Sequence, residues 1–148
     1  MDASELQQYL HDRIPLSRAM AVSVARAETG RGVVLRAPLG PNINHRDTVF
    51  GGSAAAVATL AAWSTIRVEL QAASQPGRIV IRRSTMDFEK PIAGDFAAES
   101  TPPELPEWER LLAALRRGRM GRIVVRSVLS CEGARVGAFD GEFAVMPP

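Results

Sequence analysis

The spacing of apolar residues changes several times along the chain, and each change predicts the start of a new element. From Leu6 to Ile14 the apolar residues recur every three or four positions, which is the period of an amphipathic helix. Ser4 and Gln7 stand in the pattern of a capping box at its start, and Pro15 ends it. The chain is therefore expected to begin with a short helix that has one buried face.

A hairpin and a long apolar helix are expected next. Residues 20–28 and 32–39 have the composition of two strands, and Gly30 lies in the short connection between them. From 53 to 72 the residues are apolar on every side until Arg67, which is typical of a helix at the centre of a fold. At ~1.5 Å per residue this helix is about 30 Å long, and its many small side chains would let a sheet approach it closely.

Strands make up most of the second half of the chain. The stretch 78–91 contains an alternating run of apolar and charged residues, and 93–100 follows as another strand. Residues 101–118 predict a linker and a second amphipathic helix, with acidic residues at its start and arginines at its end. Residues 122–146 predict two strands joined by a Glu-Gly turn. Strands that cluster between helices in this way indicate the α+β class with an antiparallel sheet.

Composition narrows the class of protein without changing this picture. The 148 residues are 46% hydrophobic and 23% charged, the balance of an ordinary globular chain, so we expect one domain over residues 1–148. The net charge of +2 is too small to indicate a nucleic-acid partner. The one basic cluster is expected to be a solvated helix end; its members are Arg116, Arg117, Arg119 and Arg122.

Cysteine usage and hydropathy favour a cytoplasmic protein without a membrane segment. Cys131 is the only cysteine, so no disulfide can form within the chain, and no signal-peptide pattern is visible at its start. Residues 49–66 carry no charge and reach the length at which a membrane span is considered. They are mostly Ala, Gly, Ser and Thr, however, and this content favours a buried helix.

Several stretches of the chain resemble proteins of the hotdog fold, in which an antiparallel sheet wraps around a long helix. They are Asn44 six residues before FGGS, MDFEKPIAGD after the helix, and the final hairpin GRIVVRSVLSCEGARVGAFDGEF. RIPLSRAM, APLGPNINHRDTVFGGS and LAAW further resemble the YiiD C-terminal-domain family of thioesterase-like proteins. The resemblance implies the hotdog fold, an acyl-thioester substrate, and a homodimer or dimer of dimers whose subunits share the site.

The resemblance places the site where the polar loop meets the apolar helix. Backbone N–H groups at a helix N-terminus carry partial positive charge and suit a developing oxyanion. Gly51 and Gly52 have no Cβ, so a substrate can approach these groups closely. Asn44 matches the asparagine that orients water or the thioester in hotdog thioesterases; alternatively it caps its own loop. Ser53 would hydrogen-bond the substrate or cap the helix.

Two departures from the family pattern leave the reaction open. Phe50 stands where many hotdog thioesterases have histidine, and Thr59 stands where they have the acidic base or nucleophile. For a hydrolase, His45 or Asp47 would have to supply the base, although Asp47 occupies a position where relatives often have glycine. For a decarboxylase of malonyl thioesters, an oxyanion hole suffices and no base is needed. The third alternative is a non-catalytic hotdog that binds acyl thioesters or only dimerises.

The remaining candidates concern the substrate. We expect it to contact Phe50, Gly52, Ser53, Thr59, Trp63, Ser84 and Met86, with Leu60 also near the acyl slot. Core packing is the alternative role for the apolar members of this set. Coenzyme A or acyl carrier protein would need cations near the mouth, and Arg46, Arg82, Arg83 and Lys90 are the candidates. No metal is expected, and no cofactor apart from the coenzyme A or phosphopantetheine that belongs to the substrate.

Overall fold

The computed structural model describes residues 1–148, and its elements follow the predicted order of helices and strands. They are α1 (Ala3–Arg13), α2 (Pro15–Ala19), β1 (Ser23–Glu28), β2 (Gly32–Ala37), the 3-10 turn η1 (Gly40–Asn42), α3 (Gly51–Ala72), β3 (Arg78–Phe88), β4 (Phe96–Ser100), α4 (Leu105–Arg116), β5 (Gly121–Cys131) and β6 (Ala134–Met146).

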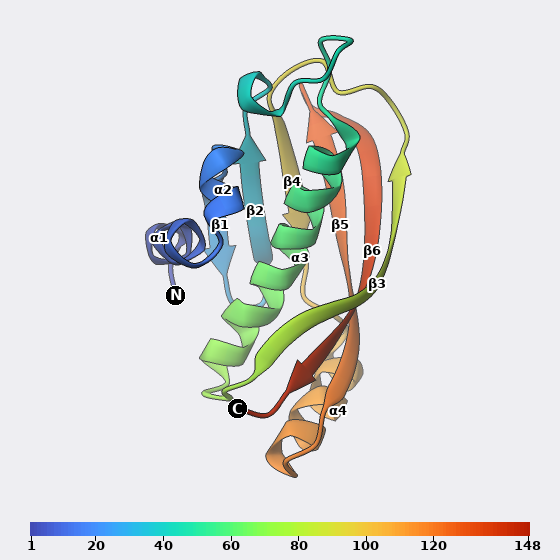
Figure 1. The fold of residues 1–148 in the computed structure, drawn as a ribbon. Helices are drawn as coiled ribbons and strands as arrows, with labels where there is room; N and C mark the ends of the chain where they lie inside the picture. The colour runs from blue at the N-terminus through green and yellow to red at the C-terminus, as the bar shows by residue number, and fades with distance from the viewer.

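Six strands form one antiparallel sheet that curves around α3 (Figure 1). Their order across the sheet is β1-β2-β4-β5-β6-β3. β5 shows why the sheet has two unlike faces, because its side chains alternate strictly between buried and exposed over most of its length. The prediction of an α+β fold with an antiparallel sheet around a long helix is confirmed.

Small side chains let the sheet come close to α3. Ala58, Ala61 and Ala62 are completely buried between the helix and the strands. At this contact the hydroxyl of Ser127 on β5 donates a hydrogen bond of 2.8 Å to the carbonyl of Ala58. A sheet residue that bonds the helix backbone directly leaves no room for longer side chains, so the alanines fix the distance between the two layers.

No helix in the structure has the length and apolar content that crossing a membrane would require.

The N-terminal helix α1 begins two residues earlier than predicted. Its N-cap is Asp2, which forms a reciprocal capping box with Glu5, so the predicted box of Ser4 and Gln7 is wrong. Gln7 instead has a long-range partner, because its amide oxygen accepts a hydrogen bond of 2.9 Å from the N–H of Val24. This N–H lies at the irregular point of β1, and α1 thus fastens the edge strand there.

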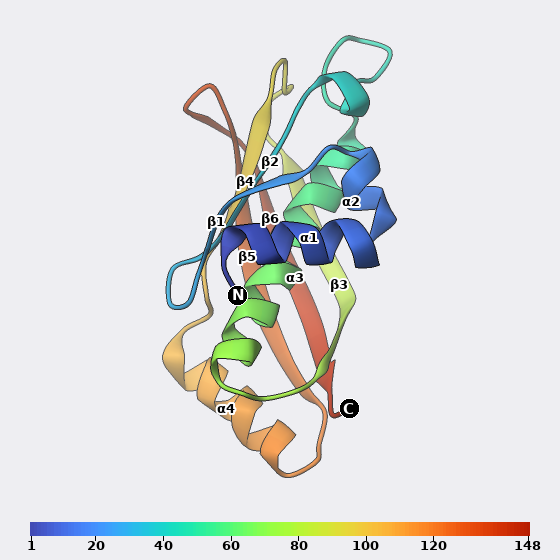
Figure 2. The same cartoon turned by 90° about the vertical axis from the view of Figure 1, so that its left-hand side faces the viewer.

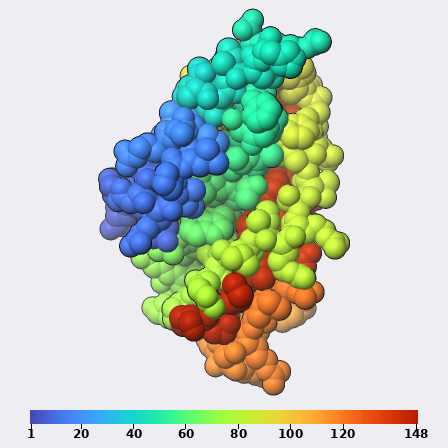
Figure 3. Space-filling model, in the orientation of Figure 1, coloured from blue at the N-terminus to red at the C-terminus, as the bar shows by residue number.

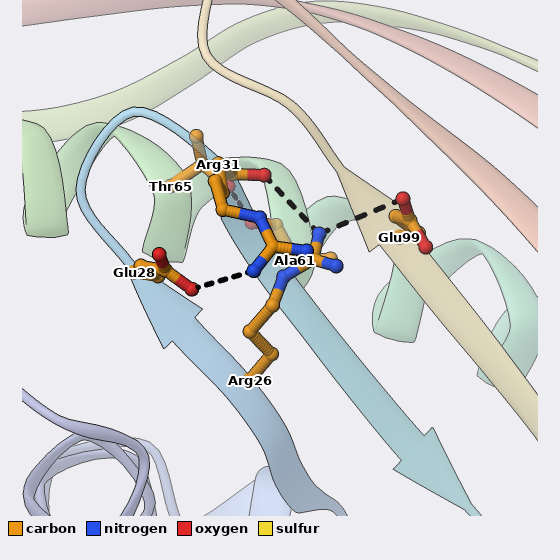
Figure 4. Close-up of polar contacts among 6 residues, drawn as sticks. All are labelled: Arg26, Glu28, Arg31, Ala61, Thr65 and Glu99. Carbon is orange, nitrogen blue, oxygen red and sulfur yellow. Dashed lines mark hydrogen bonds and ion pairs between the residues drawn. The ribbon is translucent and has the colours of Figure 1, made fainter.

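Four charged side chains and one backbone carbonyl interact at the hairpin of β1 and β2, on the outer face of the sheet (Figure 4). A terminal nitrogen of Arg26 lies 3.5 Å from the carboxylate of Glu99 on β4 and 3.1 Å from the carbonyl of Arg31. Arg31 in turn pairs with Glu28 at 3.0 Å. Since most of these groups are exposed, the pairs orient the hairpin more than they stabilise the fold.

The other edge of the sheet, β3, is unusually open. Most of its residues are exposed, and Val80, Ile81 and Phe88 keep 43%, 41% and 59% of their surface in solvent. Only β6 pairs with β3, so its other edge presents unpaired backbone groups. α4 does not protect this edge, because it lies at the end of the sheet away from the loop that precedes α3 (Figure 2).

Candidate functional site

The loop from η1 to α3 is anchored at both ends by Asn42. This side chain is buried and donates hydrogen bonds of 2.9 Å and 2.8 Å to the carbonyls of Met20 and Pro38. The backbone carbonyl of Asn42 accepts a hydrogen bond of 2.7 Å from the N–H of Phe50, the residue just before α3. The polar loop therefore has a fixed position relative to the start of the helix.

Asn44 shapes the tip of this loop. Its side-chain oxygen accepts from the N–H groups of Arg46, at 2.8 Å, and Thr48, at 3.2 Å. Its side-chain nitrogen donates to the Thr48 hydroxyl at 3.0 Å and, at 3.4 Å, to the carbonyl of Val49. These are the contacts of a loop-capping asparagine, the alternative that the sequence left open. The Asn44 side chain therefore holds the loop in its conformation.

The three residues at the loop tip are exposed. His45, Arg46 and Asp47 extend from the surface, and neither His45 nor Asp47 has a side-chain hydrogen bond within the chain. Asp47 has a φ of 62°, in the left-handed region that favours glycine. Glycine would adopt this backbone angle without steric cost. The two predicted bases therefore lie at the exposed tip of the loop, beyond the bridge between Ile43 and Val49, without a side-chain hydrogen bond that orients them.

The start of α3 has unbonded donors. The helix begins at Gly51 with Phe50 as its N-cap and without any side-chain cap, so the alternative of Ser53 as N-cap is wrong. The first helical hydrogen bond runs from the N–H of Ala54 to the carbonyl of Phe50. The N–H groups of Gly51, Gly52 and Ser53 have no acceptor in the chain. A Cβ on Gly52 would collide with the exposed ring of Phe50, so a larger residue there would require that ring to move.

A cavity of about 310 Å³ lies beside Gly51. Its apolar wall includes Met86 and Phe88 at the end of β3, and Lys90 also lines it. A Cβ on Gly51 would lie 3.3 Å from the ring of Phe88, so the glycine keeps this side of the helix start open. Of the predicted site residues, Gly51 and Met86 line the cavity. Phe88 was not predicted as a site residue, although it alternates with charged residues as Met86 does.

The other predicted contacts lie along the uncovered side of α3 and on β3. The hydroxyl of Thr59 donates to the carbonyl of Ala55 at 2.8 Å, a bond within its own helix. The indole of Trp63 donates to the carbonyl of Ile79 at 3.2 Å and so joins α3 to β3. Ser84 is exposed on β3. Figure 3 shows this side of α3 as green atoms between α1 and α2 on one side and β3 on the other.

One ion pair and one free cation border the cavity. Arg135 on β6 binds the carboxylate of Glu89 through two nitrogens, each at 3.0 Å. This hydrogen bonding lowers the pKa of Glu89 below its ordinary value and raises the pKa of Arg135. Lys90, the only lysine of the chain, is exposed and makes no ion pair. The sequence could not reveal the Glu89–Arg135 pair because 46 residues separate its members.

Known proteins match the chain over nearly its whole length. A family model described as "Putative thioesterase (yiiD_Cterm)" matches residues 3–147. A protein of unknown function from Chlorobaculum tepidum is 24% identical with a TM-score of 0.91, and the match covers 99% of this chain and 94% of that one. A "putative thioesterase" from Shewanella oneidensis is 28% identical with a TM-score of 0.87, over 99% and 97% of the two chains. A thioesterase from Haemophilus influenzae, 13% identical, shares the hotdog fold with a TM-score of 0.79 over 99% and 92%.

Proposed function

Because the chain belongs to the YiiD C-terminal thioesterase-like family, we propose that it hydrolyses acyl thioesters of coenzyme A or acyl carrier protein. The observation that carries this proposal is the start of α3. Three backbone N–H groups without an acceptor lie there, at Gly51, Gly52 and Ser53, and Gly51 lines a cavity with an apolar wall. Such donors stabilise the negative charge that develops on a thioester oxygen.

The reaction then follows from where charge appears. The thioester oxygen accepts hydrogen bonds from Gly51 and Gly52 while water adds to the carbonyl carbon. The proton of the water passes to a base, for which Asp47 and His45 in the adjoining loop are the candidates. When the tetrahedral intermediate collapses, the carbon–sulfur bond breaks and the thiol leaves with that proton. Asn44 supports these steps by holding the loop, and Lys90 offers a cation for a phosphate of the carrier.

Decarboxylation of a malonyl thioester is the second candidate, and Thr59 favours it. The hydroxyl at this helix position bonds the carbonyl of Ala55 and cannot act as a carboxylate base. Loss of carbon dioxide from a malonyl group leaves an enolate on the thioester oxygen. The same N–H groups would stabilise this enolate without any base to activate water.

The family resemblance implies a homodimer, and we further propose that its two copies pair through the open edge of β3. The exposed apolar side chains of Ile81 and Phe88 and the unpaired backbone of β3 support this arrangement. A second contact between dimers would use the outer face of the sheet, where Val124 and Val128 are 41% and 39% exposed. Pairing through β3 would cover part of the uncovered side of α3 and enclose the proposed site.

The test is a mass-spectrometric assay of the purified protein against acyl and malonyl thioesters of coenzyme A and acyl carrier protein. Free thiol from acyl thioesters is expected. A thioester that stays intact but loses carbon dioxide would establish the decarboxylase instead. Absence of any product from the whole panel would favour a protein that only binds thioesters.

Asn44→Ala provides the matched test of the site. Loss of its side-chain hydrogen bonds should release the loop and lower turnover by about tenfold or more, while the fold is retained. Pro41→Ala, an exposed residue at the start of the same loop, should keep most of the activity. Parental turnover by Asn44→Ala would show that the site has been placed wrongly.

A further inference from the structure

A single arginine of α3 has no charged partner. Arg67 is half-buried, and no ion pair or hydrogen bond joins its guanidinium to the rest of the chain. Its Nε is completely buried without an acceptor. The guanidinium carbon lies 3.7 Å from the centre of the Tyr9 ring and 5.9 Å from that of Trp63. The aromatic rings hold this cation in place but satisfy none of its N–H groups.

Arg67 borders a cavity that contains no acidic residue. This cavity, of about 420 Å³, lies where α3 ends and β3 begins (Figure 1). Arg67 is the only charged residue among those that line it. Gln71, Ser74 and Gln75 offer neutral hydrogen-bonding groups, and Leu70 and Ile79 form part of an apolar wall. The lining therefore combines one positive charge, neutral polar groups and an apolar surface.

The geometry of this cation suits a carboxylate. The Tyr9 ring covers one face of the guanidinium. Nε is buried, but the two terminal nitrogens have no partner and stay accessible, so their edge is open to a planar bidentate partner. The C-terminal pole of α3 opposes an anion, but part of that pole is neutralised locally. The N–H groups of Ser74 and Gln75 bond the carbonyls of Gln71 and Leu70 at 3.0 Å each.

We propose that this cavity binds the carboxylate group of an organic acid with a small apolar body. One guanidinium balances one negative charge, so the site favours a monoanionic carboxylate over a phosphate dianion. The apolar wall distinguishes such an acid from a bare inorganic anion. If the chain is a thioesterase, as proposed above, this acid is the carboxylic acid that hydrolysis releases. The binding of a carboxylate at this cavity does not rest on that proposed function.

The probe is hexanoate, with its methyl ester and inorganic phosphate as comparisons. Titration followed by NMR of the Gln71 and Gln75 side-chain amides should show saturable binding of hexanoate, and weaker binding at high salt. Arg67→Met keeps an apolar stem against Tyr9 but removes the charge. It should weaken binding at least tenfold, which corresponds to about 1.4 kcal/mol. Arg78→Met is the matched control, because Arg78 is an exposed arginine that does not line the cavity.

Several outcomes would overturn the proposal. They are no hexanoate binding by the folded parent, equal binding by Arg67→Met, and binding of phosphate or the methyl ester as tight as that of hexanoate. If Arg67→Met fails to fold, Arg67→Lys keeps the charge without the planar fork and should still weaken binding. Hexanoate binding by the Asn44→Ala variant separates this site from the proposed catalytic one. Turnover without hexanoate binding would contradict only the present inference.

Discussion

At the scale of single residues, the backbone of Asp47 and its side chain make separate predictions. Its left-handed φ of 62° costs an L-residue free energy that glycine does not lose. Asp47→Gly should therefore raise the free energy of unfolding by about 0.5–1 kcal/mol, after the flexibility of glycine is subtracted. If Asp47 is also the base, the same variant should lose turnover. Denaturant unfolding and the thioester assay measure the two effects independently.

Asp47→Asn is the control for this prediction. Asparagine tolerates the left-handed region as well as aspartate does but cannot accept a proton from water. Its stability should stay within about 0.5 kcal/mol of the parent, as expected for a surface substitution. Full turnover by both variants would remove Asp47 from the mechanism and leave His45 as the candidate base in the loop.

The ion pair of Glu89 and Arg135 predicts a titration at the rim of the cavity. The hydrogen bonds from Arg135 lower the pKa of Glu89 in the folded protein relative to the unfolded chain. The pair therefore contributes to stability above the unfolded pKa, and this contribution is lost as the pH falls through the lower folded pKa. Carbon-13 NMR should show a pKa of Glu89 below that of an ordinary glutamate. The substitution Arg135→Met should raise the pKa of Glu89. An unchanged pKa in that variant would contradict the assigned cause.

At the scale of elements, the cap of α1 gives a clear comparison. Asp2 accepts a hydrogen bond of 2.9 Å from the N–H of Glu5, whereas Ser4 lies inside the helix and caps nothing. Asp2→Ala should lower the free energy of unfolding by about 1 kcal/mol. Ser4→Ala should change it by less than about 0.5 kcal/mol. Thermal or denaturant unfolding would measure both, and a larger loss for Ser4→Ala would contradict the observed cap.

The elements could be predicted from sequence where local patterns decide them. The uncharged run that starts α3 and the alternation in β5 each depend on a short window of residues. Such a pattern does not decide which of two nearby residues, Asp2 or Ser4, caps α1, and the predicted cap Ser4 is wrong. The contacts of Gln7 with Val24 and of Arg67 with Tyr9 join distant parts of the chain. No local period contains them, so the structure alone reveals them.

At the scale of the whole molecule, β3 is an edge strand that the single chain leaves largely exposed. The alternation of Met86 and Phe88 with charged residues predicts a half-buried strand, yet most of β3 is exposed on both faces. Ile79 and Met86 pack against the core, but no element of the chain covers Val80, Ile81 and Phe88 to the same extent. A second copy that pairs with β3 would remove this mismatch between sequence pattern and burial.

Ile81→Lys tests this pairing in the whole molecule. Because Ile81 is 41% exposed, a lysine at this position should be tolerated by the single chain but should block the approach of another edge strand. Sedimentation should give twice the 16.0 kDa of the chain for the parent and a mass near 16.0 kDa for the variant. Leu105→Lys is the matched control, since Leu105 is 64% exposed but lies on α4. It should sediment like the parent.

If Ile81→Lys has the mass of the parent, β3 is excluded as the interface. If the variant loses both the dimer and turnover, the site needs both subunits.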